Sequence, residues 1–154
     1  MTAYFMDSSA ISKRYMTEIG SVWVRSWAAP TAGHVIVIAQ LALVEVSSAL
    51  ARKQRLAQIS AADPVQHRMD FLTDAETLYL TVPLEEAVLL QASDLVGRYP
   101  LRTLDAVQLA CALAGAAILG EPLTFVCAAT NLLNAPAGEG LATDNPLAHP
   151  YREV

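Results

Sequence analysis

Lysine is scarce in this chain: Lys13 and Lys53 are the only two, and each lies beside an arginine. With 10 basic and 15 acidic residues, the formal net charge is −5. A chain of this charge has no broad positive field with which to attract nucleic acid. Any polyanionic partner must therefore be held by a few local side chains.

Cysteine and histidine are also few, and none is spaced like a metal ligand. Cys111 and Cys127 lie in apolar surroundings without a C-x-x-C or Cys/His pattern, so we interpret them as reduced core thiols. His34, His67 and His149 are scattered along the chain, and we interpret them as surface or incidental residues. These observations argue against a disulfide scaffold and against a zinc site.

Long apolar runs are missing, although 54% of the residues are hydrophobic. A membrane-spanning helix needs about 20 consecutive apolar residues, whereas residues 106–120 are too few and residues 26–44 are interrupted by Pro30 and Gly33. The start of the chain also lacks the basic residues and the cleavage site of a signal peptide. We therefore expect a cytoplasmic protein with no membrane association, folded as a single domain over residues 1–154.

Short β-branched or aromatic runs alternate with longer helical segments. This alternation predicts an α/β fold with a mostly parallel sheet of four or five strands, covered by helices on both faces. In such sheets, ligands bind at the carboxyl ends of the strands. The expected strands are 4–6, 34–39, 78–82 and 123–129, with one more short strand in the tail, and the expected helices are 8 onward, 21–29, 41–56, 60–76, 84–98, 102–119 and 131–136.

Three acids stand at or near the start of apolar segments, where solvent is not expected: Asp7, Glu45 and Asp105. Each has an ordinary structural interpretation. Asp7 precedes two serines and is typical of a helix cap, Glu45 is compatible with a salt bridge to an arginine, and Asp105 is compatible with a cap or a first-turn acid. Taken one at a time, none requires a function.

Taken together, the same three carboxylates lie on separate elements of one predicted sheet and can converge on a single point. An unpaired buried carboxylate is costly, so it protonates, pairs with a cation or binds a metal. A cluster of oxygen ligands without histidine suits Mg²⁺ or Mn²⁺. The pattern therefore favours a divalent metal site.

Four segments around these acids follow one another in a characteristic order. They read YFMDSSAISKRYMTEIGS, LALVEVSSALAR, YPLRTLDAVQLACALA and LTFVCAATNLL. Their order and spacing resemble the PIN-domain ribonucleases, most closely the VapC-like toxins of toxin–antitoxin pairs, over residues 4–147. The resemblance implies a PIN-like three-layer fold, a metal-dependent endoribonuclease, a homodimer and a small antitoxin partner that occupies the active-site groove.

The resemblance also assigns roles to residues. Asp7 and Asp105 are expected to coordinate Mg²⁺ or Mn²⁺, with Glu45 as a third ligand or as the base that orients the attacking water. One departure concerns Ala129, which stands where the family usually has a fourth acid. Its loss predicts weaker binding of a second metal. The supporting candidates are Ser9, which otherwise serves as a simple cap, and Thr130 and Asn131, which could supply a neutral oxygen.

Four basic residues flank the acidic motifs and are candidate contacts to RNA phosphates: Lys13, Arg14, Arg52 and Arg102. The alternative for the Lys13-Arg14 and Arg52-Lys53 pairs is a solvated helix face. For the whole protein, one alternative is a PIN-like fold that binds antitoxin or RNA without cutting. A haloacid-dehalogenase-type hydrolase is disfavoured, because Ser9 stands where that class has a second aspartate. A structural protein that dimerises through the helices at 41–56 and 84–98 leaves the three acids unexplained.

Overall fold

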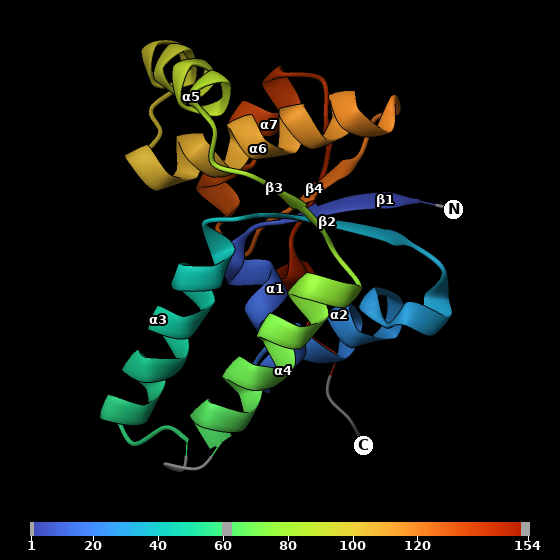
Figure 1. The fold of residues 1–154 in the computed structure, drawn as a ribbon, viewed down its shortest axis with the longest axis vertical. Coiled ribbons are helices and arrows are strands. Elements are labelled where there is room, and N and C mark those ends of the chain that lie inside the picture. Colours follow the sequence, from blue (N-terminus) through green and yellow to red (C-terminus); the bar gives the residue numbers. More distant parts are fainter. Residues whose placement is uncertain (1, 60–62, 152–154) are drawn as a thin grey trace.

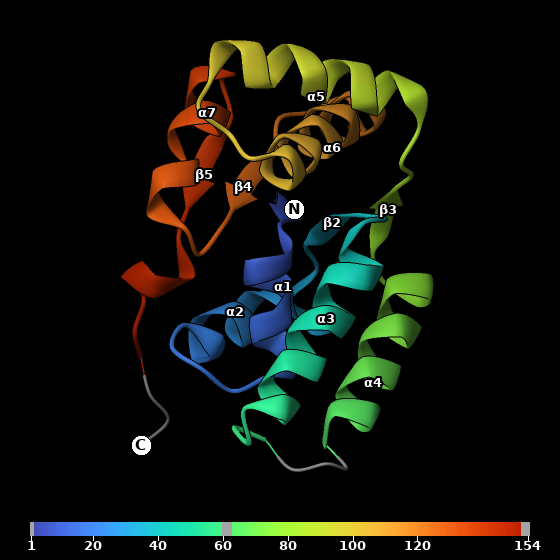
Figure 2. The ribbon, with the colours of Figure 1, turned by 90° about the vertical axis from the view of Figure 1, so that its left-hand side faces the viewer.

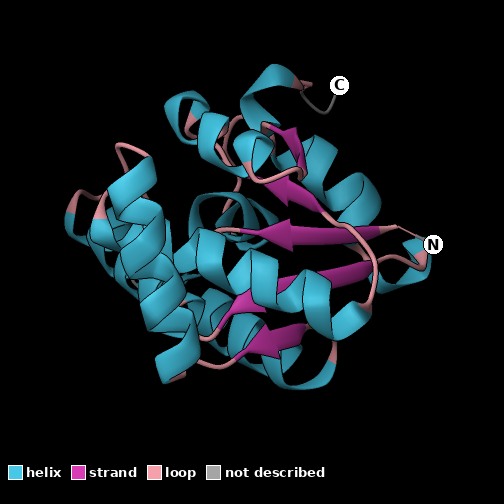
Figure 3. Cartoon of the chain, turned by 90° about the horizontal axis from the view of Figure 1, so that it is seen from above, coloured by secondary structure: helices cyan, strands magenta, loops and turns pink. Residues whose placement is uncertain are grey.

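A five-stranded, all-parallel sheet forms the centre of the molecule, as Figures 1 and 3 show. The computed structural model describes residues 2–59 and 63–151. The strand order is β3-β2-β1-β4-β5. The strands are β1 (Ala3–Met6), β2 (Val35–Ala39), β3 (Leu80–Val82), β4 (Thr124–Val126) and β5 (Ala142–Asp144).

Helices cover both faces of this sheet and give three layers. In Figures 1 and 2, four helices lie below the sheet and three lie above it. The lower helices are α1 (Ser8–Tyr15), α2 (Ser21–Ala28), α3 (Ala42–Arg55) and α4 (Asp63–Thr77); the upper ones are α5 (Glu86–Arg98), α6 (Thr103–Leu119) and α7 (Asn134–Gly138). Short 3₁₀ turns lie at Pro30–Ala32, Thr130–Leu132 and Pro146–Ala148.

Side-chain alternation along the strands divides the core into two parts. Phe5 and Val37 point to the α5–α6–α7 side, whereas Met6 and Ile38 point to the α1–α4 side. All four are fully buried. A parallel strand buried on both faces needs a continuous apolar run, which explains why β1 and β2 lack polar residues.

The order of the strands creates a switch point between β1 and β4. The chain moves from β1 to β2 and β3 on one side, and later returns to β4 and β5 on the other side. Residues Met6 and Val126 are paired in register, so Asp7 and Cys127 emerge side by side. A ligand site is expected where neighbouring strands lead away in opposite directions.

The predicted α/β architecture is confirmed, with every strand parallel. The expected strand at 123–129 is too long, because β4 ends at Val126. Beyond it, the Ala128 N–H donates to the Ser9 hydroxyl instead of continuing the ladder (3.0 Å). The expected helix at 131–136 is a 3₁₀ turn followed by α7, and the expected start of α4 at residue 60 falls outside the described residues.

Among the described residues, no one helix combines the length and the apolar composition needed to cross a bilayer. Helices α5 and α6 meet these criteria only as a pair, and their axes are bent by 118°.

Helix α6 lies very close to the sheet at Gly115. A Cβ atom at this position would come within 2.9 Å of Cγ1 of Val37, a buried residue of β2. A Cβ atom at Gly97, near the end of α5, would have no neighbouring atom within 4 Å. The two glycines therefore differ in packing although both are helical.

We predict opposite effects of alanine at these two positions. Gly97→Ala is expected to raise the free energy of unfolding by about 0.5 kcal/mol, because alanine has the higher helix propensity and meets no neighbour. Gly115→Ala is expected to lower it by about 1–3 kcal/mol, because the added methyl group overpacks the contact with Val37. Urea unfolding of both variants measures the difference, and equal effects would contradict this account of the contact between α6 and β2.

Candidate active site

Asp7 lies at the switch point of the sheet, between the last residue of β1 and the first residue of α1. Its backbone N–H donates to the carbonyl of Val126 (3.1 Å), which fixes the ends of β1 and β4 to each other. The residue is 7% exposed, and its side chain caps α1 by accepting from the Ala10 N–H (3.0 Å). The helix-cap interpretation is therefore confirmed, and the carboxylate also faces the candidate site.

The pKa of Asp7 is raised above its ordinary value, chiefly because burial disfavours the charged form. Hydrogen bonds from Cys127, Ser9 and Ala10 oppose this shift, and the negative charge of Glu45 adds to it. The bonds from Ser9 (2.6 Å) and Ala10 both end on Oδ1. A nearby cation would relieve the unfavourable burial of this charge.

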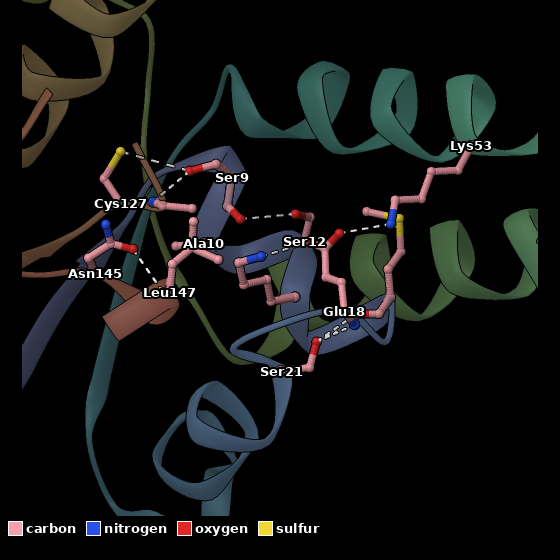
Figure 4. A network of polar contacts seen from close by, with 12 residues as sticks. Ser9, Ala10, Ser12, Glu18, Ser21, Lys53, Cys127, Asn145 and Leu147 are labelled. Atoms are coloured by element: carbon pink, nitrogen blue, oxygen red, sulfur yellow. Dashed lines mark hydrogen bonds and ion pairs between the residues drawn. The ribbon is translucent and has the colours of Figure 1, made fainter. Parts of the chain in front are cut away.

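Ser9 joins the ends of two strands through a single hydroxyl group. It donates to Asp7 and accepts from the N–H of Ala128. Its oxygen also lies 3.8 Å from Sγ of Cys127, as Figure 4 shows. Its hydroxyl does not cap α1, because Asp7 fills that position. Ser9 thus supports the carboxylate directly.

Glu45 lies in the first turn of α3 and is held by two hydrogen-bond donors. Ser8 Oγ donates to Oε1 of Glu45 (2.8 Å), and Nε2 of Gln108 donates to the same oxygen (2.6 Å). Among residues 2–59 and 63–151, no arginine forms the salt bridge to Glu45 that was the alternative interpretation. Neutral hydrogen-bond donors therefore position the carboxylate of Glu45. In the described part of the chain, no cationic side chain pairs with it.

Asp105 lies in the first turn of α6, as the first-turn interpretation predicts. It lines a small, mainly apolar pocket together with Asp7, Gln108 and Cys127. The pKa of Asp105 is raised by burial, and the charge of Arg102 partly opposes the shift. Within residues 2–59 and 63–151, its carboxylate accepts no hydrogen bond and forms no ion pair.

The three acids thus lie around the same end of the sheet, but they do not form a compact triad. Asp7 and Asp105 share the small pocket, whereas Glu45 faces a neighbouring groove with Ser8 and Ser9. In the described part of the chain, no group of three or more His, Cys, Asp and Glu residues is arranged to hold a metal ion. The oxygen donors of Asp7 and Asp105 are nevertheless of the type that hard divalent cations take.

Both lysines of the chain meet at one carboxylate in the groove between α1 and α3. Lys13 and Lys53 contact different oxygens of Glu18, at 3.1 and 2.8 Å, as Figure 4 shows in part. Burial alone would raise the pKa of Glu18, but the two ammonium groups lower it on balance. The Lys13 side chain is only 7% exposed, so the solvated-face interpretation is wrong for this residue.

The four candidate phosphate contacts occupy three different places. Lys13 and the exposed Arg52 line the groove that also contains Glu45. Arg102 is exposed and precedes α6 beside Asp105. Arg14 lies elsewhere: it pairs with Asp74 (3.2 Å) and contacts the hydroxyls of two tyrosines, Tyr15 and Tyr79. Only the first three surround the candidate site.

The position of the missing fourth acid offers no substitute carboxylate. Ala129 follows β4, and the Thr130 hydroxyl accepts from the side-chain amide of Asn145 (3.0 Å). Asn131 is exposed, and neither Thr130 nor Asn131 lines the pocket of Asp7 and Asp105. Asp144, the next acid along the chain after this position apart from Glu139, ends β5, where it contacts His149 (2.8 Å). That histidine stacks on Trp23 at 4.1 Å between ring centroids, so it packs more specifically than expected.

The sequence interpretation did not single out Ser8, Gln108 or Cys127 as site residues. Gln108 follows Asp105 by three positions, which places both on one face of a helix, and it interrupts an otherwise apolar run. Cys127 directly follows β4, the strand beside β1. Burial raises the pKa of its thiol, so Cys127 is a neutral neighbour of Asp7 and not an activated nucleophile.

Comparisons with known proteins identify the family. A model of the PIN domain matches residues 4–119, and the chain belongs to the PIN domain family. No curated protein sequence matches the chain.

Solved structures share its fold at low sequence identity. VapBC2 from Rickettsia felis, bound to a promoter DNA fragment, has a TM-score of 0.62 and 11% identity, covering 94% of this chain and 98% of that chain. PAE2754 from Pyrobaculum aerophilum has a TM-score of 0.63 and 19% identity, with coverages of 96% and 85%. VapC20 from Mycobacterium tuberculosis, described as a toxin that cleaves the sarcin–ricin loop, has a TM-score of 0.60 and 16% identity, with coverages of 86% and 94%. At these identities the likeness establishes the fold.

We predict that Asp7→Asn stabilises the metal-free protein at neutral pH. Asparagine keeps the helix cap and carries no charge, so it avoids the cost of burying a charged group, which is the main cause of the raised pKa of Asp7. Because an acid with a raised pKa stabilises the fold only when protonated, the advantage of asparagine should shrink as the pH falls through that raised pKa toward the ordinary value of 3.8. Thermal unfolding of both proteins between pH 4 and pH 7, in EDTA, measures this; a variant less stable than wild type at pH 7 would disprove it.

Proposed function

We propose that this protein is an Mg²⁺- or Mn²⁺-dependent endoribonuclease that acts in the cytoplasm as the toxin of a toxin–antitoxin pair. The observation that carries the proposal is the placement of Asp7, Glu45 and Asp105 at the switch point of a PIN fold. Membership of the PIN domain family supports nuclease chemistry. Solved relatives described as VapBC and FitAB assemblies support an antitoxin partner, and the proposal includes a homodimer.

The chain's own groups have distinct tasks in this proposal. Asp7 and Asp105 would hold the cation with oxygen donors in a pocket whose other walls are largely apolar. A bound Mg²⁺ or Mn²⁺ supplies Lewis-acid polarisation of a phosphodiester and activates water at neutral pH. Glu45, held by Ser8 and Gln108, is placed either to bind the same ion or to orient a nucleophilic water. The apolar walls exclude bulk water and strengthen these electrostatic contacts.

RNA would approach along the groove between α1 and α3. Arg52 is exposed there, while Glu18 occupies the ammonium groups of both Lys13 and Lys53. The groove therefore offers limited positive charge, in agreement with the net charge of −5. Single-stranded or loop RNA fits such a site, because its phosphates and bases can be reached without opening a duplex.

A second candidate function is binding of RNA or antitoxin without cleavage. It is favoured by Ala129, which removes one acid from the family's pattern, and by the engagement of Asp144 with His149. Titration with Mn²⁺ separates the two functions. When Mn²⁺ is added, an enzyme gains thermal stability and cuts RNA, whereas a protein that binds RNA or antitoxin without cleavage does neither.

We predict that Asp105→Asn lowers the rate of Mn²⁺-dependent RNA cleavage by at least about 100-fold, since the loss of a direct ligand exceeds the 10–100-fold cost typical of a supporting residue. Asparagine preserves size and the first-turn position. The matched control is Asp94→Asn, which removes an exposed acid on α5 and should leave the rate unchanged. Gel-based cleavage of a mixed single-stranded RNA measures both variants, and wild-type cleavage by purified Asp105→Asn would refute the proposal.

We predict that Arg52→Gln weakens RNA binding and that Arg14→Gln does not. Removing one phosphate contact should reduce the slope of log K against log salt concentration by about 0.7 for a single strand. Arg14→Gln should instead lower thermal stability, because it breaks the ion pair with Asp74. Fluorescence anisotropy in EDTA, where no cleavage occurs, measures affinity at several salt concentrations. Equal losses in both variants would show that the groove between α1 and α3 is not the binding path.

A further inference from the structure

Gln108 is a buried polar residue in the middle of the apolar face of α6. The residue is 4% exposed, and it lies one helical turn after Asp105. Nε2 donates to Glu45 (2.6 Å) and also to the Ser8 hydroxyl (3.1 Å). The other end of the amide, Oε1, is buried and has no hydrogen-bond partner in the described part of the chain.

The orientation of this amide follows from electrostatics. A carboxylate only accepts hydrogen bonds when ionised, so the nitrogen of Gln108 must face Glu45. A flipped amide would place two acceptors against each other. Oε1 is therefore directed away from Glu45, and a buried acceptor without a donor is unfavourable unless a ligand satisfies it.

The surroundings of Gln108 identify the class of that ligand. Gln108 lines the same small pocket as Asp7 and Asp105, whereas Glu45 is not part of its lining. The lining of the pocket thus contains two aspartates and one glutamine whose Oε1 has no hydrogen-bond partner in the described part of the chain. Carboxylate and carbonyl oxygens both suit hard cations such as Mg²⁺ and Mn²⁺, and the amide oxygens of Asn and Gln occur among the ligands of divalent cations.

We propose that Gln108 provides the third protein oxygen of the metal site through Oε1, and that Glu45 acts as a positioning residue that fixes the Gln108 amide. The inference rests on the proposed metal dependence. It agrees with the absence of a three-acid cluster among the described residues, because the third donor is neutral. It also gives a site that keeps three oxygen donors although Ala129 replaces the usual acid.

The test measures Mn²⁺ binding directly, by electron paramagnetic resonance of free Mn²⁺ and by thermal shift, without RNA. Gln108→Met keeps the volume of the side chain and removes the oxygen, and it should raise the Kd for Mn²⁺ at least about tenfold. Glu45→Gln should raise the Kd less than Gln108→Met does. Gln66→Met, at an exposed position on α4, is the matched control and should bind as wild type does.

The double variant separates a direct ligand from an indirect effect. If Gln108 acted only by holding Glu45, then Gln108→Met would have no further effect once Glu45 is glutamine. We expect it to raise the Kd at least about tenfold in that background as well. An unchanged Kd in the Glu45→Gln background, or complete loss of Mn²⁺ binding in Glu45→Gln alone, would overturn the assignment.

Two further measurements keep the result interpretable. If circular dichroism shows that Gln108→Met is unfolded, Gln108→Glu in the Glu45→Gln background replaces it. This variant keeps an oxygen donor at position 108 and adds a negative charge, so it should bind Mn²⁺ at least as tightly as Glu45→Gln, and weaker binding would refute the assignment. RNA cleavage by wild type is measured in parallel. Wild type that binds Mn²⁺ in the expected pattern but cuts no RNA would refute the nuclease proposal alone, whereas wild type that binds no Mn²⁺ would refute both.

Discussion

The burial of one carboxylate where two parallel strands end is the constraint on which this site depends. Asp7 lies at the junction of β1 and α1, next to the point where β1 and β4 end side by side. The strand order places the switch point of the sheet between these two strands. The helix cap, the Ser9 hydroxyl and the neutral Cys127 make this burial tolerable without making it favourable. The fold thus buries a carboxylate that forms no ion pair with any lysine, arginine or histidine among residues 2–59 and 63–151.

The other polar groups of the site are arranged around that charge by the layers on both faces of the sheet. Helix α3 brings Glu45 from below, and helix α6 brings Asp105 and Gln108 from above. Ser8 and Gln108 connect the two layers through Glu45. The close contact between α6 and β2 at Gly115 sets the distance between this helix and the sheet. Packing at Gly115 therefore helps to position Asp105 and Gln108, which lie on the same helix.

Much of the fold and part of the site could be predicted from the sequence, for reasons tied to particular residues. Asp7, Glu45 and Asp105 were recognisable because each acid adjoins a strongly apolar segment, and such placement has a high energetic cost. Gln108 was missed because a neutral amide carries no comparable signal until its partners are known. The burial of Lys13 was equally hidden, since its partner Glu18 becomes a neighbour of Lys53 only after α1 packs against α3.

The hydroxyl group of Ser9 has a mechanical consequence for the crevice. One oxygen atom links the carboxylate after β1 to the backbone after β4, donating to one and accepting from the other. Separating the two loops would break the bond between Ala128 and Ser9 but not the bond between Ser9 and Asp7, because Ser9 and Asp7 lie on the same segment of the chain. The Ser9 hydroxyl therefore adds a side-chain link to the backbone bond between Asp7 and Val126, and the carboxylate keeps its hydrogen bond from Ser9 even if the loop after β4 moves.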